Sequence, residues 1–112
     1  MRADLIRGHL DLLILSIVGT SATHGYAIVE ELRRRSGGGF DLPEGTVYPA
    51  LYRLEGAGLL ASDWQEVGGR RRRVYRLTRS GRKALEGKKQ EWSAFAGAIT
   101  QVIGRTAWVG PA

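Results

Sequence analysis

The stretch EGTVYPALYRLE, residues 44–55, decides the fold of this 112-residue chain. Its apolar residues recur at helical spacing, which predicts a helix over the whole stretch with Leu51 and Leu54 facing the core. Pro49 would remove a hydrogen bond inside a helix. We therefore expect the helix to be kinked at the proline or else to start late, near Thr46, because the first turn has backbone N–H groups without intrahelical acceptors and tolerates proline.

A second helix is predicted just upstream, over residues 24–35, and three glycines at 37–39 end it. Thr23 is its expected N-cap. The arginines at 33–35 are expected to form a solvated face near its end. A short helix, a turn with glycine and another short helix form the helix-turn-helix pattern. The expected inward stripe of this second helix consists of Tyr26, Val29 and Leu32, with Ile28 alongside.

Downstream of the quoted stretch, the pattern changes to short segments rich in β-forming residues. Residues 60–66 and 73–77 alternate between two faces, and residues 67–69 form the turn between them. This predicts a β-hairpin whose tip carries the run of arginines from Arg70 to Arg73. Such a dense positive charge on a narrow projection suits a groove lined with phosphate.

The N-terminal apolar run at 12–18 predicts a buried helix. A signal peptide or membrane span is the alternative, but Asp11 and Ser16 interrupt the run, which is much shorter than the roughly 20 apolar residues that a span needs. The helix is apolar on more than one side, so we expect its own domain to cover one face and a second subunit the other. One face carries Ile6, Leu10, Leu13, Ile14 and Ile17, while Leu5, Leu12 and Leu15 lie on others.

A long helix is predicted from the N-cap Thr78 to about Ile103. An amphipathic helix of this length, outside a compact three-helix body, needs a partner, and self-association is the economical answer. The structure of the tail at 104–112, which includes Trp108, is left open. The apolar heptad positions are Leu85, Trp92, Phe95, Ile99 and Val102, interrupted by Lys88.

Composition limits the class of function. The chain has 17 Lys and Arg against 11 Asp and Glu, a net charge of +6, which favours nucleic acid or acidic lipid headgroups as partners. With no cysteine, there is neither a disulfide framework nor a thiolate metal site, and a cytoplasmic setting is the simpler interpretation. His9 and His24 are isolated and no phosphate-binding loop occurs, so we predict no enzyme activity, no cofactor and no metal.

Three motifs in order carry a family resemblance: HGY at 24–26, EGTVYPALYRLE at 44–55 and GGRRRRVYRLT at 68–78. Together they resemble the PadR family of transcriptional regulators over about residues 10–103. The resemblance implies a mainly α fold with a small β-hairpin: a winged helix-turn-helix domain at 1–78, a C-terminal dimerisation helix at 79–103 and a tail. It also implies a homodimeric transcriptional repressor. Such a repressor binds a pseudo-palindromic operator in double-stranded DNA, and a small molecule releases it.

The resemblance also implies the residues that meet DNA. Two departures from the family pattern are Pro43, where Ser or Asn often caps the helix, and Val74, where an aromatic is frequent. Physical chemistry supports the same roles: glycine allows close backbone approach, hydroxyls bind phosphate oxygens, and arginine binds phosphate or guanine. The alternative is that Tyr48 and Tyr52 are partly core. The recognition-helix residues are Gly45, Thr46, Tyr48, Pro49 and Arg53, and the wing residues are Gly69, Arg70, Arg71, Arg72 and Arg73.

Trp92 resembles the tryptophan that stacks on flat aromatic ligands in drug-binding members of the family. Dimer packing is the alternative role for an aromatic residue at this position. Two other classes of function stay open for the whole chain, an RNA-binding module and a protein-interaction module. The expected lining of a ligand pocket or dimer interface is Trp92, Phe95, Ala96 and Ile99, with Leu10, Ile14 and Asp11 opposite.

Overall fold

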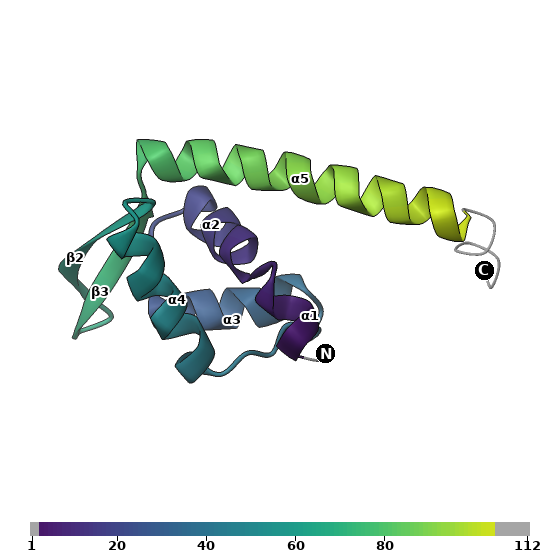
Figure 1. Ribbon diagram of the computed structural model, residues 1–112. Helices are drawn as coiled ribbons and strands as arrows, with labels where there is room; N and C mark the ends of the chain where they lie inside the picture. The colour runs from purple at the N-terminus through teal and green to yellow at the C-terminus, as the bar shows by residue number, and fades with distance from the viewer. Residues whose placement is uncertain (1–2, 105–112) are drawn as a thin grey trace.

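The structure, a computed structural model, describes residues 3–104. Five helices and three strands follow one another along this part of the chain (Figure 1). The helices α2, α3 and α4 form a bundle, the hairpin of β2 and β3 flanks it, and α5 runs across it and beyond. The bounds are α1 (Ala3–Arg7), α2 (Leu10–Thr20), β1 (Thr23–His24), α3 (Gly25–Arg35), α4 (Glu44–Gly56), β2 (Leu60–Val67), β3 (Arg70–Leu77) and α5 (Arg79–Ile103).

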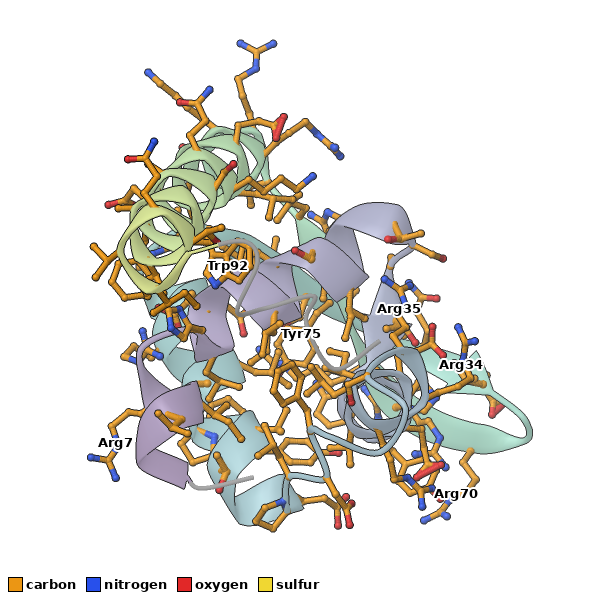
Figure 2. The ribbon with its side chains drawn as sticks, turned by 90° about the vertical axis from the view of Figure 1, so that its right-hand side faces the viewer. Arg7, Arg34, Arg35, Arg70, Tyr75 and Trp92 are labelled. Atoms are coloured by element: carbon orange, nitrogen blue, oxygen red, sulfur yellow. The ribbon has the colours of Figure 1, made fainter. Side chains whose placement is uncertain are left out.

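The core lies where α2, α3 and α4 meet the base of the sheet. Leu51 and Leu54 of α4 are buried in it, as the sequence predicted. Tyr75 of β3 is only 1% exposed and lies inside the helical body (Figure 2). The hairpin is thus fixed to the bundle at its base. Other side chains of this cluster are Ile6, Leu10, Ile14, Leu15, Ile17, Val18, Ile28, Leu32, Val47 and Leu60.

The sheet has three antiparallel strands in the order β1, β3, β2, and the sequence analysis missed β1. Thr23 pairs with Tyr75. Thr23 is therefore not the N-cap of α3; His24 takes this role, and its Nδ1 accepts a hydrogen bond from the backbone N–H of Ala27. Tyr26 was predicted to face the core, but half of its surface is exposed. Tyr26 lies in the first turn of α3, where its ring stacks on His24 and lies near Arg72 instead of packing in the core.

The predicted N-terminal helix is two helices, because the chain turns at Gly8 and His9 between α1 and α2. The N–H of His9 donates to the carbonyl of Ile6 at 2.8 Å, which closes the end of α1. Both Ile6 and Leu10 are buried, so the break leaves the apolar face facing the core. Leu5 is 62% exposed.

The helix α4 begins at Glu44, as the pattern predicted, and not at the alternative late start near Thr46. Pro49 is therefore its sixth residue and lies inside it. Pro43 precedes the helix without a side-chain cap, and its carbonyl accepts hydrogen bonds from the N–H groups of Thr46 and Val47. The outward side of the helix carries the proline, which is exposed to solvent.

The long helix α5 begins as predicted, with Thr78 as its N-cap. The Thr78 hydroxyl accepts from the N–H of Gly81 at 2.9 Å and lies 2.7 Å from the carbonyl oxygen of Gly58. A Cβ at position 81 would lie 2.0 Å from the carbonyl oxygen of Leu59, so only glycine allows this close approach. Leu85 anchors the helix to the core, and the remainder extends past the bundle (Figure 1). The long dimension of the molecule is consequently 51 Å.

Candidate nucleic-acid interface

The outward face of α4 presents four of the five residues predicted for the recognition helix. Gly45, Thr46, Pro49 and Arg53 are all exposed. The apolar residues of the helix are buried on its inward face, so α4 has one buried side and one exposed side. The buried set consists of Val47, Ala50, Leu51 and Leu54.

Tyr48, the fifth residue, is half-buried and packs against α3. A Cβ at Gly25 would lie 2.5 Å from the Cε1 atom of its ring. Burial raises the pKa of the Tyr48 phenol, and the Glu44 carboxylate adds to the effect. The neutral phenol is therefore both a packing element between the two helices and a hydroxyl at the edge of the exposed face.

The hairpin closes through Gly68 and Gly69, whose φ angles of +60° and +78° suit a two-residue turn. Val67 pairs with Arg70, so β3 begins at Arg70. The arginines were predicted to form the tip, but they lie in the strand. Consecutive residues of a strand point to opposite faces, so the run divides between the two faces of the hairpin.

Each face of the hairpin has its own aromatic partner. The Cζ atoms of Arg71 and Arg73 lie 5.2 and 5.7 Å from the ring centroid of Trp64, which pairs with Arg73 across the sheet. Arg72 on the other face lies 6.0 Å from the ring of Tyr26. These distances fit cation–π contacts that orient the guanidinium groups.

A cleft of about 300 Å³ separates α4 from the hairpin. Its walls carry three kinds of group suited to a phosphodiester strand: phenolic hydroxyls, guanidinium groups and flat aromatic surface. Burial and the nearby Arg72 charge lower the pKa of His24 at the edge of the cleft, which favours the neutral imidazole. The lining residues are His24, Gly25, Tyr48, Tyr52, Trp64, Arg71, Arg72, Arg73 and Tyr75.

Arg53 is already paired within the protein. Its Nη2 and Nη1 atoms donate to the two carboxylate oxygens of Asp11 at 2.6 and 3.0 Å. The hydrogen bonds from Arg53 hold the pKa of the Asp11 carboxyl below its usual value. Asp11 was predicted to line a ligand pocket, and instead it joins α2 to α4.

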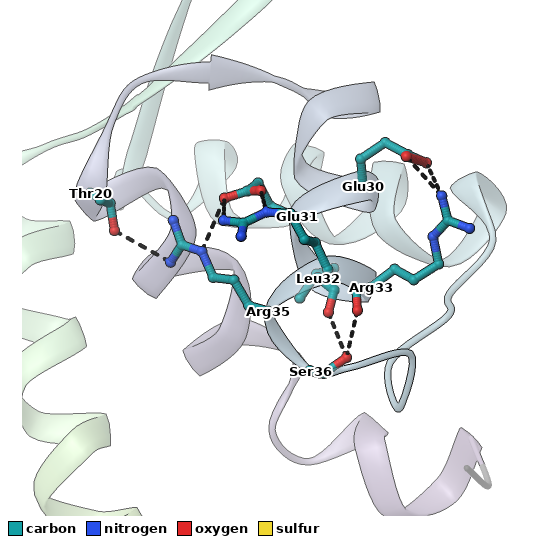
Figure 3. Close-up of polar contacts among 8 residues, drawn as sticks. Thr20, Glu30, Glu31, Leu32, Arg33, Arg35 and Ser36 are labelled. Carbon is teal, nitrogen blue, oxygen red and sulfur yellow. Dashed lines mark hydrogen bonds and ion pairs between the residues drawn. The ribbon is translucent and has the colours of Figure 1, made fainter.

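The arginines at the end of α3 match the solvated face that the sequence predicted. Arg33 pairs with Glu30, while Arg34 and Arg35 both pair with Glu31 (Figure 3). These pairs hold the pKa of the exposed Glu31 at about 2. These ion pairs offset much of the positive charge of α3, whereas within residues 3–104 no ion pair offsets that of the arginines at 70–72.

A second cleft, of about 240 Å³, lies between α5 and the junction of α1 with α2. Trp92 lies on the side of α5 that faces the body (Figure 2). Leu10 and Ile14, predicted as opposite walls, are buried in the core, because the chain break at Gly8 turns other residues toward α5. Ala96 and Ile99 lie beyond the cleft on the same helix. The cleft is lined by Gly8, His9, Leu12, Lys88, Glu91, Trp92 and Phe95.

Sequence reasoning missed three residues of the first cleft and its surroundings: Glu55, Ser62 and Trp64. Counting back from the two-glycine turn places Trp64 opposite Arg73 and Ser62 opposite Tyr75, so the hairpin register was available as a signal. Glu55 gives no such signal, because its contact with the hairpin depends on how α4 packs.

Residues 3–104 contain neither a cluster of metal-ligating side chains nor a membrane-spanning helix. No three His, Asp or Glu side chains gather there as a metal site would require. No helix in this range is long and apolar enough to cross a membrane.

Comparison with known proteins gives one consistent family. The sequence model of the transcriptional regulator PadR-like family matches residues 14–87. The transcriptional regulator Rv3488 of Mycobacterium tuberculosis is 44% identical over 79 residues, which cover 70% of this chain and 71% of that protein.

Solved structures agree in fold. A PadR family transcription regulator from Clostridium difficile R20291 is 39% identical with a TM-score of 0.77, covering 86% of this chain and 99% of that one. A transcriptional regulator from Clostridium thermocellum is 32% identical with a TM-score of 0.84, covering 93% and 99%. The residues that the family model matches include α3, α4 and the hairpin.

Proposed function

The chain belongs to the PadR-like family of transcriptional regulators, and on this premise we propose that it is a repressor that binds a two-fold DNA operator as a homodimer. One observation carries the proposal. Two tyrosines of α4, Tyr48 and Tyr52, and the arginines at 71–73 of β3 line the same cleft, so a single DNA duplex would meet both elements. In this assignment α4 is the recognition helix and the hairpin is the wing.

Each part has a role that fits its chemistry. The N-terminal half of α4 enters the major groove, where Gly45 lets the backbone come close and Thr46 binds a phosphate or a base edge. A phosphodiester strand occupies the cleft, within reach of the Tyr48 hydroxyl. Arg71 and Arg72 bind phosphates on either side of the wing.

Salt-dependent binding to duplex DNA tests these assignments. Replacing Arg71 and Arg72 by alanine should flatten the slope of log affinity against log salt by about one to two units per subunit. Arg33→Ala combined with Arg34→Ala is the matched control, because it also removes two charges, from arginines that Glu30 and Glu31 already pair. Affinity should be measured by fluorescence anisotropy between about 50 and 200 mM salt. An unchanged slope in the double variant would remove the wing from the interface.

The dimer is proposed from the exposed apolar side chains of α5. Phe95, Ile99 and Val102 are 57%, 42% and 86% exposed and recur at heptad spacing. A monomer has no reason to present such a stripe to water, whereas a second copy would cover it. Two subunits would then present two recognition helices at a fixed separation, as a pseudo-palindrome requires.

The cleft beside Trp92 is the proposed effector site. Trp92, Phe95 and His9 offer aromatic surface, and Lys88 and Glu91 add one charge of each sign, which suits a flat aromatic ligand with polar substituents. A ligand there would change how α5 lies on α2, and so the spacing of the two recognition helices. It can act only through different affinities for the two spacings.

Tryptophan fluorescence tests the effector site. Flat aromatic compounds that release the protein from DNA should quench the emission, and Trp92→Phe should lose this part of the quenching while it still dimerises. If Trp92 emission is indifferent to every compound that releases DNA, the effector binds elsewhere.

A further inference from the structure

Arg73 is bound differently from the other arginines of the wing. Its Nε donates to the Ser62 hydroxyl at 2.7 Å, and its Nη2 lies 3.3 Å from a carboxylate oxygen of Glu55. The Ser62 hydroxyl donates to the same carboxylate oxygen at 2.7 Å. These three residues come from β3, β2 and α4, so one closed network joins both strands of the wing to the recognition helix.

Trp64 extends this network toward the outer part of the wing. Its ring lies between the guanidinium groups of Arg73 and Arg71 and within 6 Å of both. Within residues 3–104, Arg71 forms no ion pair, and it is exposed. Arg71 is therefore available to a phosphate, while Arg73 is occupied.

We propose that Arg73 is a positioning residue that, with Ser62 and Glu55, fixes the angle between the wing and the recognition helix, and that it does not bind phosphate itself. The inference rests on the DNA-binding function proposed above. Its physical basis is that a two-stranded hairpin has little rigidity of its own. We call the network of Arg73, Ser62 and Glu55 the clamp. Because the clamp is formed before DNA arrives, it removes the entropic cost of ordering the wing on binding.

The length of the wing makes its angle important. Arg71 lies six residues from the end of β3 at Leu77, or about 20 Å along the strand. A swing of about 10° at the base would move Arg71 by about 3 Å, which is enough to break a hydrogen bond to phosphate. The clamp lies between this base and Arg71, where it limits such a swing.

Lysine distinguishes a clamp from a phosphate ligand. It keeps the positive charge, so it can replace an arginine that simply neutralises a phosphate. It has no planar fork that could bond Ser62 and Glu55 at once. Ser62→Ala breaks the same network without any change of charge.

The experiment compares Arg73→Lys, Ser62→Ala and the double variant, with Arg76→Lys as the matched control in the same strand, because Arg76 pairs with Asp63 and has no assigned DNA contact. The first probe is a duplex of about 30 base pairs that the wild-type protein selects from a random library, long enough for two half-sites one helical turn apart. The second is a scrambled duplex of equal length. Circular dichroism and sedimentation show first that each variant is folded and keeps the oligomeric state of the wild type.

Each clamp variant should bind the selected duplex about tenfold more weakly, and the scrambled duplex about twofold more weakly or less. The salt slope should stay that of the wild type, because no phosphate contact is lost. The double variant should be no weaker than either single one, since both break one network. Arg76→Lys should bind nearly as the wild type does.

Wild-type binding by both Arg73→Lys and Ser62→Ala would overturn the inference. So would a slope that flattens by about 0.9 per subunit in Arg73→Gln, because that variant would then have lost a phosphate contact. If Ser62→Ala does not fold, Glu55→Gln takes its place as the second break in the network. A wild-type protein that selects no duplex would overturn the proposed function as well, whereas selection followed by unaffected variants would overturn only the clamp.

Discussion

At the scale of single residues, the pair of Asp11 and Arg53 connects α2 to the recognition helix, and its contribution to stability depends on pH. Arg53 lowers the pKa of Asp11 in the folded protein from the usual 3.8. The stabilisation is therefore complete well above pH 3.8 and is lost as pH falls through the lowered folded-state value. Arg53 is 59% exposed, so solvent screening keeps the contribution to about 0.5–1 kcal/mol.

Asp11→Asn should lower the free energy of unfolding by this amount at about pH 7, and the difference from the wild type should shrink by about pH 3. Urea unfolding at both pH values measures it. Asp63→Asn is the control, because its pair with Arg76 is exposed on both sides and should contribute almost nothing. If Asp11→Asn lowers the free energy of unfolding equally at the two pH values, the ionised Asp11 carboxylate is not the source of the stabilisation.

Two glycines of the interface should respond oppositely to alanine. Gly25→Ala places a methyl group 2.5 Å from the Tyr48 ring, so it should destabilise the fold by about 1–3 kcal/mol. Gly45→Ala meets nothing within 4 Å and should stabilise α4 by about 0.5–1 kcal/mol. If DNA approaches the backbone at Gly45, that variant nevertheless binds DNA more weakly. Thermal unfolding and DNA affinity together check both changes, and a Gly25→Ala protein as stable as the wild type would contradict the packing described.

Sequence patterns predicted which residues lie on the exposed face of α4 but not what they contact. Arg53 and Asp11 are 42 positions apart, and Arg73 and Glu55 are 18 apart. Local periodicity carries no information about such pairs, because they depend on the packing of whole elements. For the same reason Leu10 and Ile14 were placed on the wrong side of α2.

At the scale of elements, the start of α5 depends on Thr78, which both caps that helix and bonds the carbonyl of Gly58 in the connection between α4 and β2. Thr78→Ala should therefore lower stability by about 1–2 kcal/mol. Thr100→Ala is a matched control in the same helix, because the Thr100 hydroxyl donates only to the helix carbonyl of Ala96. Chemical denaturation compares the two, and equal effects would mean that capping is not what Thr78 supplies.

Helices over residues 24–35, 44–55 and 79–103 and the hairpin were predictable, because hydrophobic period, caps and glycines agree locally. The short strand β1 was not, since two residues have no period and their pairing with β3 is a long-range contact. The break at Gly8 and His9 was missed because the apolar residues before and after it follow the spacing of a single continuous helix. The sequence left a late start of α4 near Thr46 open, because that start would have placed Pro49 in the first turn.

At the scale of the whole molecule, the apolar stripe of α5 should hold two copies together. Phe95→Glu should give a monomer, because it buries a charge in the proposed interface. Gln90→Glu makes a comparable change on the opposite side of α5, where Gln90 is exposed, and should leave the dimer intact. Sedimentation velocity measures both. A dimeric Phe95→Glu protein would place the interface elsewhere.

The loss of the dimer should also weaken operator binding, because each recognition helix then binds one half-site alone. The second half-site benefits from a high effective concentration only while the subunits are joined. This links the apolar stripe of α5 to the function of α4, although the two do not share a surface.

The central claim is that two copies of this chain read one DNA duplex through α4 and the wing. Footprinting on the DNA that flanks its own gene tests this most directly. We predict two protected half-sites with two-fold symmetry, about 10 base pairs apart or a multiple of that spacing, with protection that weakens steeply as salt rises. A protein that sediments as a monomer and protects no duplex DNA at low salt would contradict the account.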